Sequence, residues 1–184
     1  KSSLPQSNAL VWQDRRTSKR CTQLLGNGVL PLIRESTGLV LDPYFSATKI
    51  EWLIQNRIEL SESTAFGTID SWILWKLTDG GVFATDVTNA SRTMLFNIHD
   101  LSWDDNLLDL FGVSASNLPE VLPSSGHFGM TKNQPLLNTG IPITGVAGDQ
   151  QASLFGQTGF ADGDAKNTYG TGSFVLLNTG DSCP

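Results

Sequence analysis

Charged side chains are scarce in this sequence of 184 residues: Asp, Glu, Lys and Arg together make up 16% of it, against ~25% in an ordinary soluble protein. A chain with so few charges is not a solvated disordered tail, so much of it should be packed or covered by a partner. Basic residues are the scarcer kind, with 12 Lys and Arg against 18 Asp and Glu and a net charge of −6. This balance argues against a surface for nucleic acid or anionic membrane, because either needs a basic patch.

Cysteine and long apolar runs are scarce as well. The sequence has only Cys21 and Cys183, which excludes a disulfide scaffold and a four-cysteine zinc site and favours a reducing, cytoplasmic setting. No apolar run approaches the ~20 residues of a membrane helix, and no secretory signal is visible. Because the chain begins at Lys1 rather than Met and stops just after a strand-like run, we expect it to be a segment of a longer protein.

Apolar periodicity and turn residues predict strands alternating with helices, which indicates an α/β layer fold. The helix at 68–80 is apolar on most sides, so we expect it to be largely buried. The predicted helices are 14–26, 46–56, 68–80, 102–110 and 149–156, and the predicted strands are 8–12, 83–86, 93–98, 141–147, 165–169 and 173–178.

The junction at 146–150 carries the clearest local signal for chemistry. A strand runs into Gly148, and Asp149 then opens a helix. Ligands of α/β sheets gather at the carboxyl ends of strands, so Asp149 can serve as a general base that takes a proton from a substrate hydroxyl. The alternative is that Asp149 only caps the helix, since Asp is a preferred capping residue.

Two further groups of residues have both a functional and a structural interpretation. The loop Gly170, Thr171 and Gly172 can let backbone N–H groups approach a phosphate, or it can be a plain hairpin turn that needs positive φ. Trp12 and Tyr44 can form a sugar or polyol site, because aromatic faces pack on C–H surfaces and a phenol hydroxyl bonds other hydroxyls. The alternative for this pair is ordinary core packing.

The histidines and the basic run have only structural interpretations. His99 and His127 lie far apart without the spacing of metal ligands, so we expect no metal site from them. The basic residues of the first helix indicate a solvated helix face. They are Arg15, Arg16, Lys19 and Arg20.

Several segments, in order along nearly the whole chain, resemble the FGGY family of carbohydrate kinases. Residues 44–56 (YFSATKIEWLIQN) fit the first signature of that family across its whole length. The flanking segments narrow the resemblance to members that phosphorylate glycerol. They are 11–17, 37–39, 42–46, 66–72, 86–98 (DVTNASRTMLFNI), 147–151 (AGDQQ) and 165–174 (AKNTYGTGSF).

The resemblance implies an α/β fold of the actin-like, ribonuclease-H-like ATPase kind, with two domains and a cleft between them. Residues 1–157 would then be the second half of the N-terminal, substrate-binding domain. Residues 158–184 would be the first hairpin of the C-terminal, nucleotide-binding domain. The implied activity is transfer of the γ-phosphoryl group of Mg-ATP to a terminal hydroxyl of glycerol, in a cytoplasmic protein that forms a homo-oligomer when full-length.

The resemblance also implies roles for single residues. Asp149 would be the base on the glycerol hydroxyl, with Gln150 beside it, and Tyr44 would bond glycerol hydroxyls. Trp12 and Phe174 would pack against the carbon edge of glycerol. The loop of Gly170, Thr171 and Gly172 would face the ATP phosphates. No residue is expected to bind metal directly, although Asp149 would lie near the Mg²⁺ of Mg-ATP.

Other parts of the family pattern do not occur in the sequence. The Asp-x-Gly-Thr phosphate loop, the Arg-Glu pair that holds glycerol and the adenosine-binding residues are absent, so we expect the segment alone to be inactive. The Gly-Gly-Thr-Arg loop for a regulatory sugar bisphosphate is not matched at 139–142. Two alternatives stay open, a kinase for another polyol or sugar and a non-catalytic member of the family.

Overall fold

A computed structural model describes residues 4–56, 59–61 and 63–182. Cys183 lies outside the described residues. The chain divides into two compact units, Lys1–Val146 and Ala147–Pro184, called unit 1 and unit 2 below and described separately. The domain boundary expected after residue 157 lies further along the chain than this division and stays a prediction.

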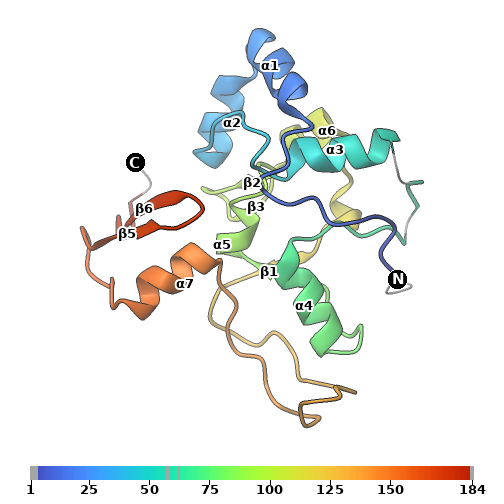
Figure 1. Ribbon diagram of the computed structural model, residues 1–184, viewed down its shortest axis with the longest axis vertical. Coiled ribbons are helices and arrows are strands. Elements are labelled where there is room, and N and C mark those ends of the chain that lie inside the picture. Colours follow the sequence, from blue (N-terminus) through green and yellow to red (C-terminus); the bar gives the residue numbers. More distant parts are fainter. Residues whose placement is uncertain (1–3, 57–58, 62, 183–184) are drawn as a thin grey trace. The chain divides into compact units, whose positions relative to one another are not determined.

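Unit 1 begins with four helices in succession, and short strands interspersed with shorter helices follow them (Figure 1). Its helix ends follow local chemistry: α2 stops at Gly38, at φ 68°, and α6 begins after Asp104, whose carboxylate accepts the Leu107 N–H. The elements are α1 (Ser18–Gly26), α2 (Leu30–Thr37), α3 (Ala47–Asn56), α4 (Ile69–Leu77), β1 (Ala84–Asp86), α5 (Val87–Ala90), β2 (Phe96–Asn97), β3 (Ser102–Trp103), α6 (Asp105–Phe111), the 3-10 helix η1 (Ala115–Asn117) and β4 (Glu120–Leu122).

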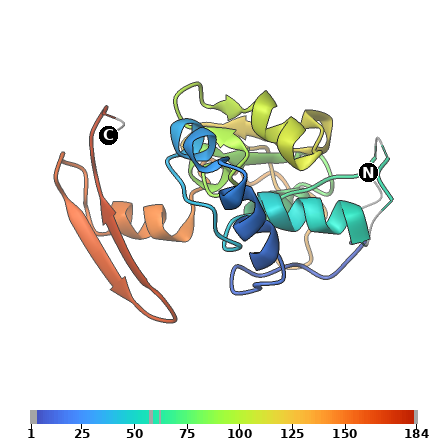
Figure 2. The same cartoon turned by 90° about the horizontal axis from the view of Figure 1, so that it is seen from above.

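Two small ladders and two apolar clusters hold unit 1 together. β1 pairs in parallel with β4, and β2 pairs antiparallel with β3. The larger cluster includes side chains of α1, α2, α3 and α6 and of residues 94–95 just before β2; these four helices lie close together in Figure 2. A smaller cluster joins α4 and β1 through Leu74, Ala84 and Phe128. Fully buried side chains of the larger cluster include Leu24, Ile33, Met94, Leu95 and Leu107.

Several predictions for unit 1 are wrong in detail, and of the strand expected at 93–98 only β2, Phe96–Asn97, is present. Residues 8–12 form no strand, because no described segment pairs with them. The first helix begins at Ser18 rather than at 14, because the Asp14 carboxylate accepts the Arg16 N–H and holds a turn. Residues 102–103 form strand β3, and the helix begins after Asp104 instead. Residues 141–147 form only isolated bridges.

The helix expected at 68–80 is present as α4 but is not largely buried. Ser71 and Leu74 are its buried residues, whereas Ile69 and Ile73 expose 68% and 49% of their surface. Its apolar side chains are spread around the helix, and the small cluster in unit 1 covers one side only.

Unit 2 contains a helix and a hairpin, as the sequence predicts. α7 spans Asp149–Gly156, and β5 (Ala165–Tyr169) pairs antiparallel with β6 (Ser173–Leu177). The register sets Lys166 opposite Leu176 and Thr168 opposite Phe174. The hairpin lies against α7 (Figure 2).

Candidate functional site

Trp12 and Tyr44 form an aromatic corner in unit 1. Their ring centroids are 5.6 Å apart with the planes tilted by 54°, and Tyr44 meets Phe45 edge-on at 5.1 Å. The Arg92 guanidinium lies 5.9 Å from the Tyr44 ring and 5.1 Å from the Phe45 ring. Phe45 is buried, Tyr44 is half-buried, and Trp12 exposes 43% of its surface. The corner therefore offers an accessible aromatic face beside a phenol hydroxyl, which suits a small polyol.

Lys49 of α3 links the two backbone segments that carry this corner. It is 4% exposed, and its Nζ donates to the carbonyl of Val11 at 2.8 Å and to that of Tyr44 at 3.4 Å. Burial lowers the pKa of Lys49, and the carboxylates of Asp14 and Asp42 oppose that change. A buried cation whose acceptors among the described residues are both backbone carbonyls fixes the chain rather than a ligand.

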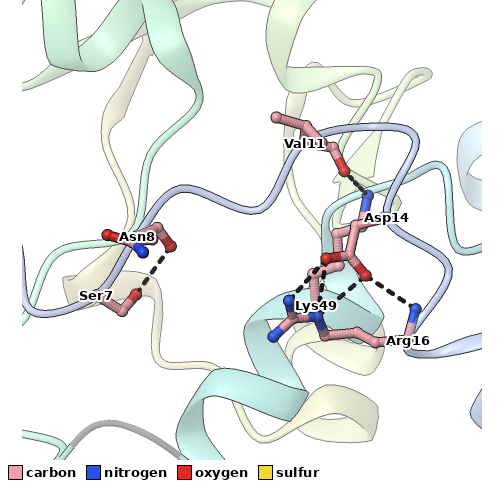
Figure 3. A network of polar contacts seen from close by, with 6 residues as sticks. All are labelled: Ser7, Asn8, Val11, Asp14, Arg16 and Lys49. Atoms are coloured by element: carbon pink, nitrogen blue, oxygen red, sulfur yellow. Dashed lines mark hydrogen bonds and ion pairs between the residues drawn. The ribbon is translucent and has the colours of Figure 1, made fainter.

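The turn that follows Trp12 is fixed by an ion pair. The Asp14 carboxylate accepts from Nε and Nη2 of Arg16 at 3.0 and 2.7 Å, and the Asp14 N–H donates to the Val11 carbonyl at 3.0 Å (Figure 3). The hydrogen bonds from Arg16 lower the pKa of Asp14 to about 2. The Arg16 guanidinium also lies 4.4 Å from the Trp52 ring centroid on α3, a favourable cation–π position.

Asp86, at the end of β1, is a buried carboxylate with an unusually full set of donors. Oδ2 accepts from Ser124 Oγ and Thr88 Oγ1, both at 2.6 Å, and from the Thr88 N–H, while Oδ1 accepts from the N–H and Nδ2 of Asn89. Burial alone would raise the pKa of Asp86, but these donors outweigh it and hold the pKa below its ordinary value. Asp86 thus joins β1, α5 and the segment after β4.

In unit 2, Asp149 stands at the first position of α7 with its carboxylate exposed. Gly148 occupies the capping position and makes no side-chain cap. Both carboxylate oxygens are held by the next residue: Oδ1 accepts the Gln150 N–H at 2.9 Å and Oδ2 accepts Gln150 Nε2 at 3.1 Å. The carboxylate thus has a set orientation as well as free lone pairs, which a general base requires.

Lys166 of β5 extends this group. It is 5% exposed, and its Nζ donates to Gln150 Oε1 at 2.6 Å and to Thr168 Oγ1 at 2.7 Å. Sequence reasoning did not single out Lys49, Asp86 or Lys166. The hairpin register offered a signal for Lys166, since its cross-strand partner is the apolar Leu176.

The loop between β5 and β6 turns the chain without a positive φ at residues 170–172. Neither Gly170 nor Gly172 has positive φ, so neither is needed for a left-handed position. A Cβ on Gly170 would meet nothing within 4 Å, whereas a Cβ on Gly172 would lie 2.9 Å from the Phe174 ring. Thr171 is exposed, and Phe174 is half-buried. The loop thus leaves open space at Gly170 and packs Gly172 against an aromatic ring.

The predicted site residues therefore form two groups. Unit 1 brings Trp12 and Tyr44 together. Unit 2 brings Asp149 beside Gln150 and, in its hairpin, Phe174 beside Gly172. The roles assigned to these residues stay predictions.

The remaining polar features are structural. His99 is exposed, with Nε2 2.9 Å from the Glu35 carbonyl, and His127 is exposed. Arg20 differs from the expected solvated face, because it pairs bidentately with Glu51 of α3. Across residues 4–56, 59–61 and 63–182, no three His, Cys, Asp or Glu side chains gather as a metal site. No helix in this part of the chain is both long and apolar enough to cross a membrane.

The sequence of this chain is similar to those of known proteins along nearly its whole length. The sequence model for the N-terminal domain of the FGGY family of carbohydrate kinases matches residues 1–156. A glycerol kinase of Symbiobacterium thermophilum is 56% identical over 182 residues, which is 96% of this chain and 36% of that protein. One from Alcanivorax borkumensis is 55% identical, over 97% and 37%. The chain spans little more than a third of the length of these relatives.

Solved structures agree with the sequence relatives. The crystal structure of Plasmodium falciparum glycerol kinase with ADP matches with a TM-score of 0.90 and 40% identity, over 96% of this chain and 36% of that one. A gluconate kinase of Lactobacillus acidophilus matches with a TM-score of 0.81 at 23% identity, over 92% and 35%, which shows the shared fold alone.

The fold is thus the α/β, actin-like ATPase fold of sugar kinases, present here in part. The chain belongs to the FGGY family of carbohydrate kinases.

Proposed function

We propose that the full-length protein containing this chain transfers the γ-phosphoryl group of ATP to a terminal hydroxyl of glycerol, giving glycerol 3-phosphate. The observation that carries the proposal is the 55–56% identity to glycerol kinases over 96–97% of the chain. The exposed aromatic corner of Trp12 and Tyr44 supports it, because a corner of this kind suits a small polyol.

Within this reaction Asp149 acts as the general base on the attacking hydroxyl. Its exposed, two-point-held carboxylate supports that role. Gln150 lies beside the base, Tyr44 bonds glycerol hydroxyls, and Trp12 and Phe174 cover the carbon edge. Phosphoryl transfer depends mainly on such positioning and on charge stabilisation, so the protein needs to do little covalent chemistry.

The loop of Gly170, Thr171 and Gly172 is our candidate for contact with the ATP phosphates. The open space where a Gly170 Cβ would lie and the exposed Thr171 hydroxyl fit the close approach of a phosphate. Mg²⁺ would be held through the phosphates, supplying charge neutralisation, with Asp149 near it rather than gathered with other acids. The buried thiol of Cys21, whose pKa burial raises, suits the cytoplasmic setting that we propose. The homo-oligomeric state of the full-length protein stays part of this proposal.

A kinase for another polyol or sugar is the competing function. The likeness to gluconate and xylulose kinases, at 22–23% identity, supports only a common fold. A non-catalytic family member is the other competitor, and the exposed carboxylate of Asp149 speaks against it.

The test is ADP release by the full-length protein with glycerol, erythritol, xylulose and gluconate, beside its Asp149→Asn form. We expect release with glycerol, lowered by orders of magnitude in the variant with the fold intact, because losing the base is a transition-state defect. Asp105→Asn is the matched control, since Asp105 also opens a helix and is exposed. Release with another compound instead would reject the substrate, and near-normal turnover of Asp149→Asn would reject the base.

A further inference from the structure

Lys166 of β5 is a buried cation. Among the described residues no Asp or Glu oxygen lies within 4.0 Å of its ammonium. Its two acceptors, Gln150 Oε1 at 2.6 Å and Thr168 Oγ1 at 2.7 Å, are neutral. Burying an ammonium is costly unless it is hydrogen-bonded, and an apolar residue opposite Leu176 would avoid this cost. We therefore ask how the Lys166 ammonium affects its hydrogen-bond acceptors, Gln150 and Thr168.

The ammonium determines which end of the Gln150 amide faces Asp149. An ammonium only donates hydrogen bonds, whereas a side-chain amide has an accepting oxygen and a donating nitrogen. Lys166 therefore requires the Gln150 oxygen on its side and leaves the Gln150 NH₂ to face Asp149, where it donates to Oδ2 at 3.1 Å. Turning the amide over would set the NH₂ against the ammonium and the oxygen against the carboxylate, so both contacts would become repulsive.

This chain of contacts lies within unit 2 and ends at the proposed base. The Gln150 N–H holds Oδ1 of Asp149 and the Gln150 side chain holds Oδ2, so the carboxylate is fixed at two points. Without Lys166 the Gln150 amide is anchored at its Asp149 end only, so its hold on Oδ2 is weaker and the backbone contact carries more of the positioning.

We propose that Lys166 is a positioning residue for phosphoryl transfer, which acts by locking the Gln150 amide in the orientation that holds the Asp149 carboxylate for its hydroxyl substrate. The inference rests on the proposed function, because it takes Asp149 as the base. It assigns no direct contact between Lys166 and a substrate.

The kinetic test is a double-mutant cycle in the full-length protein, with Lys166→Met, Gln150→Met and the double variant. Met is close to both side chains in size but has neither the charge nor the amide. We expect Lys166→Met to lower kcat roughly 10- to 100-fold, the loss associated with misplacing a reacting group. The KM for ATP should stay within about twofold of wild type. Because Lys166 acts through Gln150, the double variant should be no slower than Gln150→Met alone.

Two further variants separate this role from a merely structural one. Lys166→Arg also only donates hydrogen bonds, so it should keep most of the wild-type kcat. Lys132→Met is the matched control, since Lys132 is exposed and lies in unit 1, and it should behave as wild type. If kcat losses multiply in the double variant, or if Lys166→Arg loses as much as Lys166→Met with an unchanged melting temperature, the proposal is wrong.

A readout that does not need activity keeps this proposal apart from the proposed function. In protein labelled with ¹⁵N-glutamine, the Gln150 NH₂ should exchange its hydrogens more slowly in wild type than in Lys166→Met. Equal exchange in the two proteins would overturn the role of Lys166. A wild-type protein that phosphorylates no polyol would reject the proposed function instead, and the exchange comparison would still decide the role of Lys166.

Discussion

Replacing Lys49 by Met should weaken glycerol binding while leaving most of the fold in place. Lys49 holds the Val11 carbonyl at 2.8 Å and the Tyr44 carbonyl at 3.4 Å, and so joins the segments of Trp12 and Tyr44. A hydrogen bond from a charged donor contributes about 1.5–3 kcal/mol, and only the shorter contact has the length for this. Global stability should change less, because the variant no longer buries an ammonium.

The loss should therefore appear mainly as a less ordered Trp12 segment. If ordering the Trp12 segment on binding then costs about 1.5 kcal/mol of free energy, the Kd for glycerol rises about tenfold. The kcat should stay within about threefold, since Asp149 is not altered. Calorimetric titration of the full-length protein with glycerol measures the Kd, and Lys19→Met, an exposed position in α1, is the matched control. An unchanged Kd together with a lowered melting temperature would show that Lys49 serves stability only.

Three other substitutions test single contacts. Tyr44→Phe should weaken glycerol binding by ~0.5–1.5 kcal/mol, the worth of one hydrogen bond, and an unchanged Kd would remove its hydroxyl from the site. Arg20→Met should lower the free energy of unfolding by ~1–3 kcal/mol in urea titrations, because it leaves the 8% exposed Glu51 without its bidentate partner. An unchanged free energy of unfolding would mean that the pair is not formed in solution. Asp86→Asn should cost ~2–4 kcal/mol, because one amide NH₂ must then face the donors of Ser124 and Thr88 or of Asn89. The pKa of Asp86 is lower in the folded protein than in the unfolded chain. The stability that its carboxylate contributes is therefore complete above pH ~4 and is lost as the pH falls through the folded pKa. Wild type should lose more stability than Asp86→Asn on acidification below pH ~4, and equal losses would contradict the lowered pKa.

The sequence predicted correctly those elements whose ends are marked by local residues such as glycine. The helix after Gly148 and the hairpin around Gly170 and Gly172 lie where the sequence placed them, because glycines and alternating apolar residues mark both ends. The strands predicted at 8–12 and 141–147 are absent because no local residue shows whether a strand will find a pairing partner. An apolar run becomes a strand only if a neighbour pairs with it, and pairing partners are not visible in a local pattern.

The candidate site was predicted through whole motifs, and its supporting residues were missed. Trp12, Tyr44 and Asp149 have side chains that suggest chemistry on their own. Lys49 resembles an ordinary surface lysine in the sequence, and Lys166 is marked only by its place opposite Leu176 in the hairpin, yet both are buried in the fold. Their partners are a carbonyl 38 residues away for Lys49 and an amide 16 residues away for Lys166, separations that no periodicity reveals.

The aromatic corner also gives the protein an optical reporter. An indole that is partly exposed and touches a phenol ring, as Trp12 does, changes its emission when water at its face is replaced by a ligand. Glycerol itself absorbs no light at indole wavelengths, so any change on titration would come from the protein. Trp12→Phe removes this fluorophore and leaves the other four tryptophans as background, which makes ligand binding at this corner measurable without a label or a coupled enzyme.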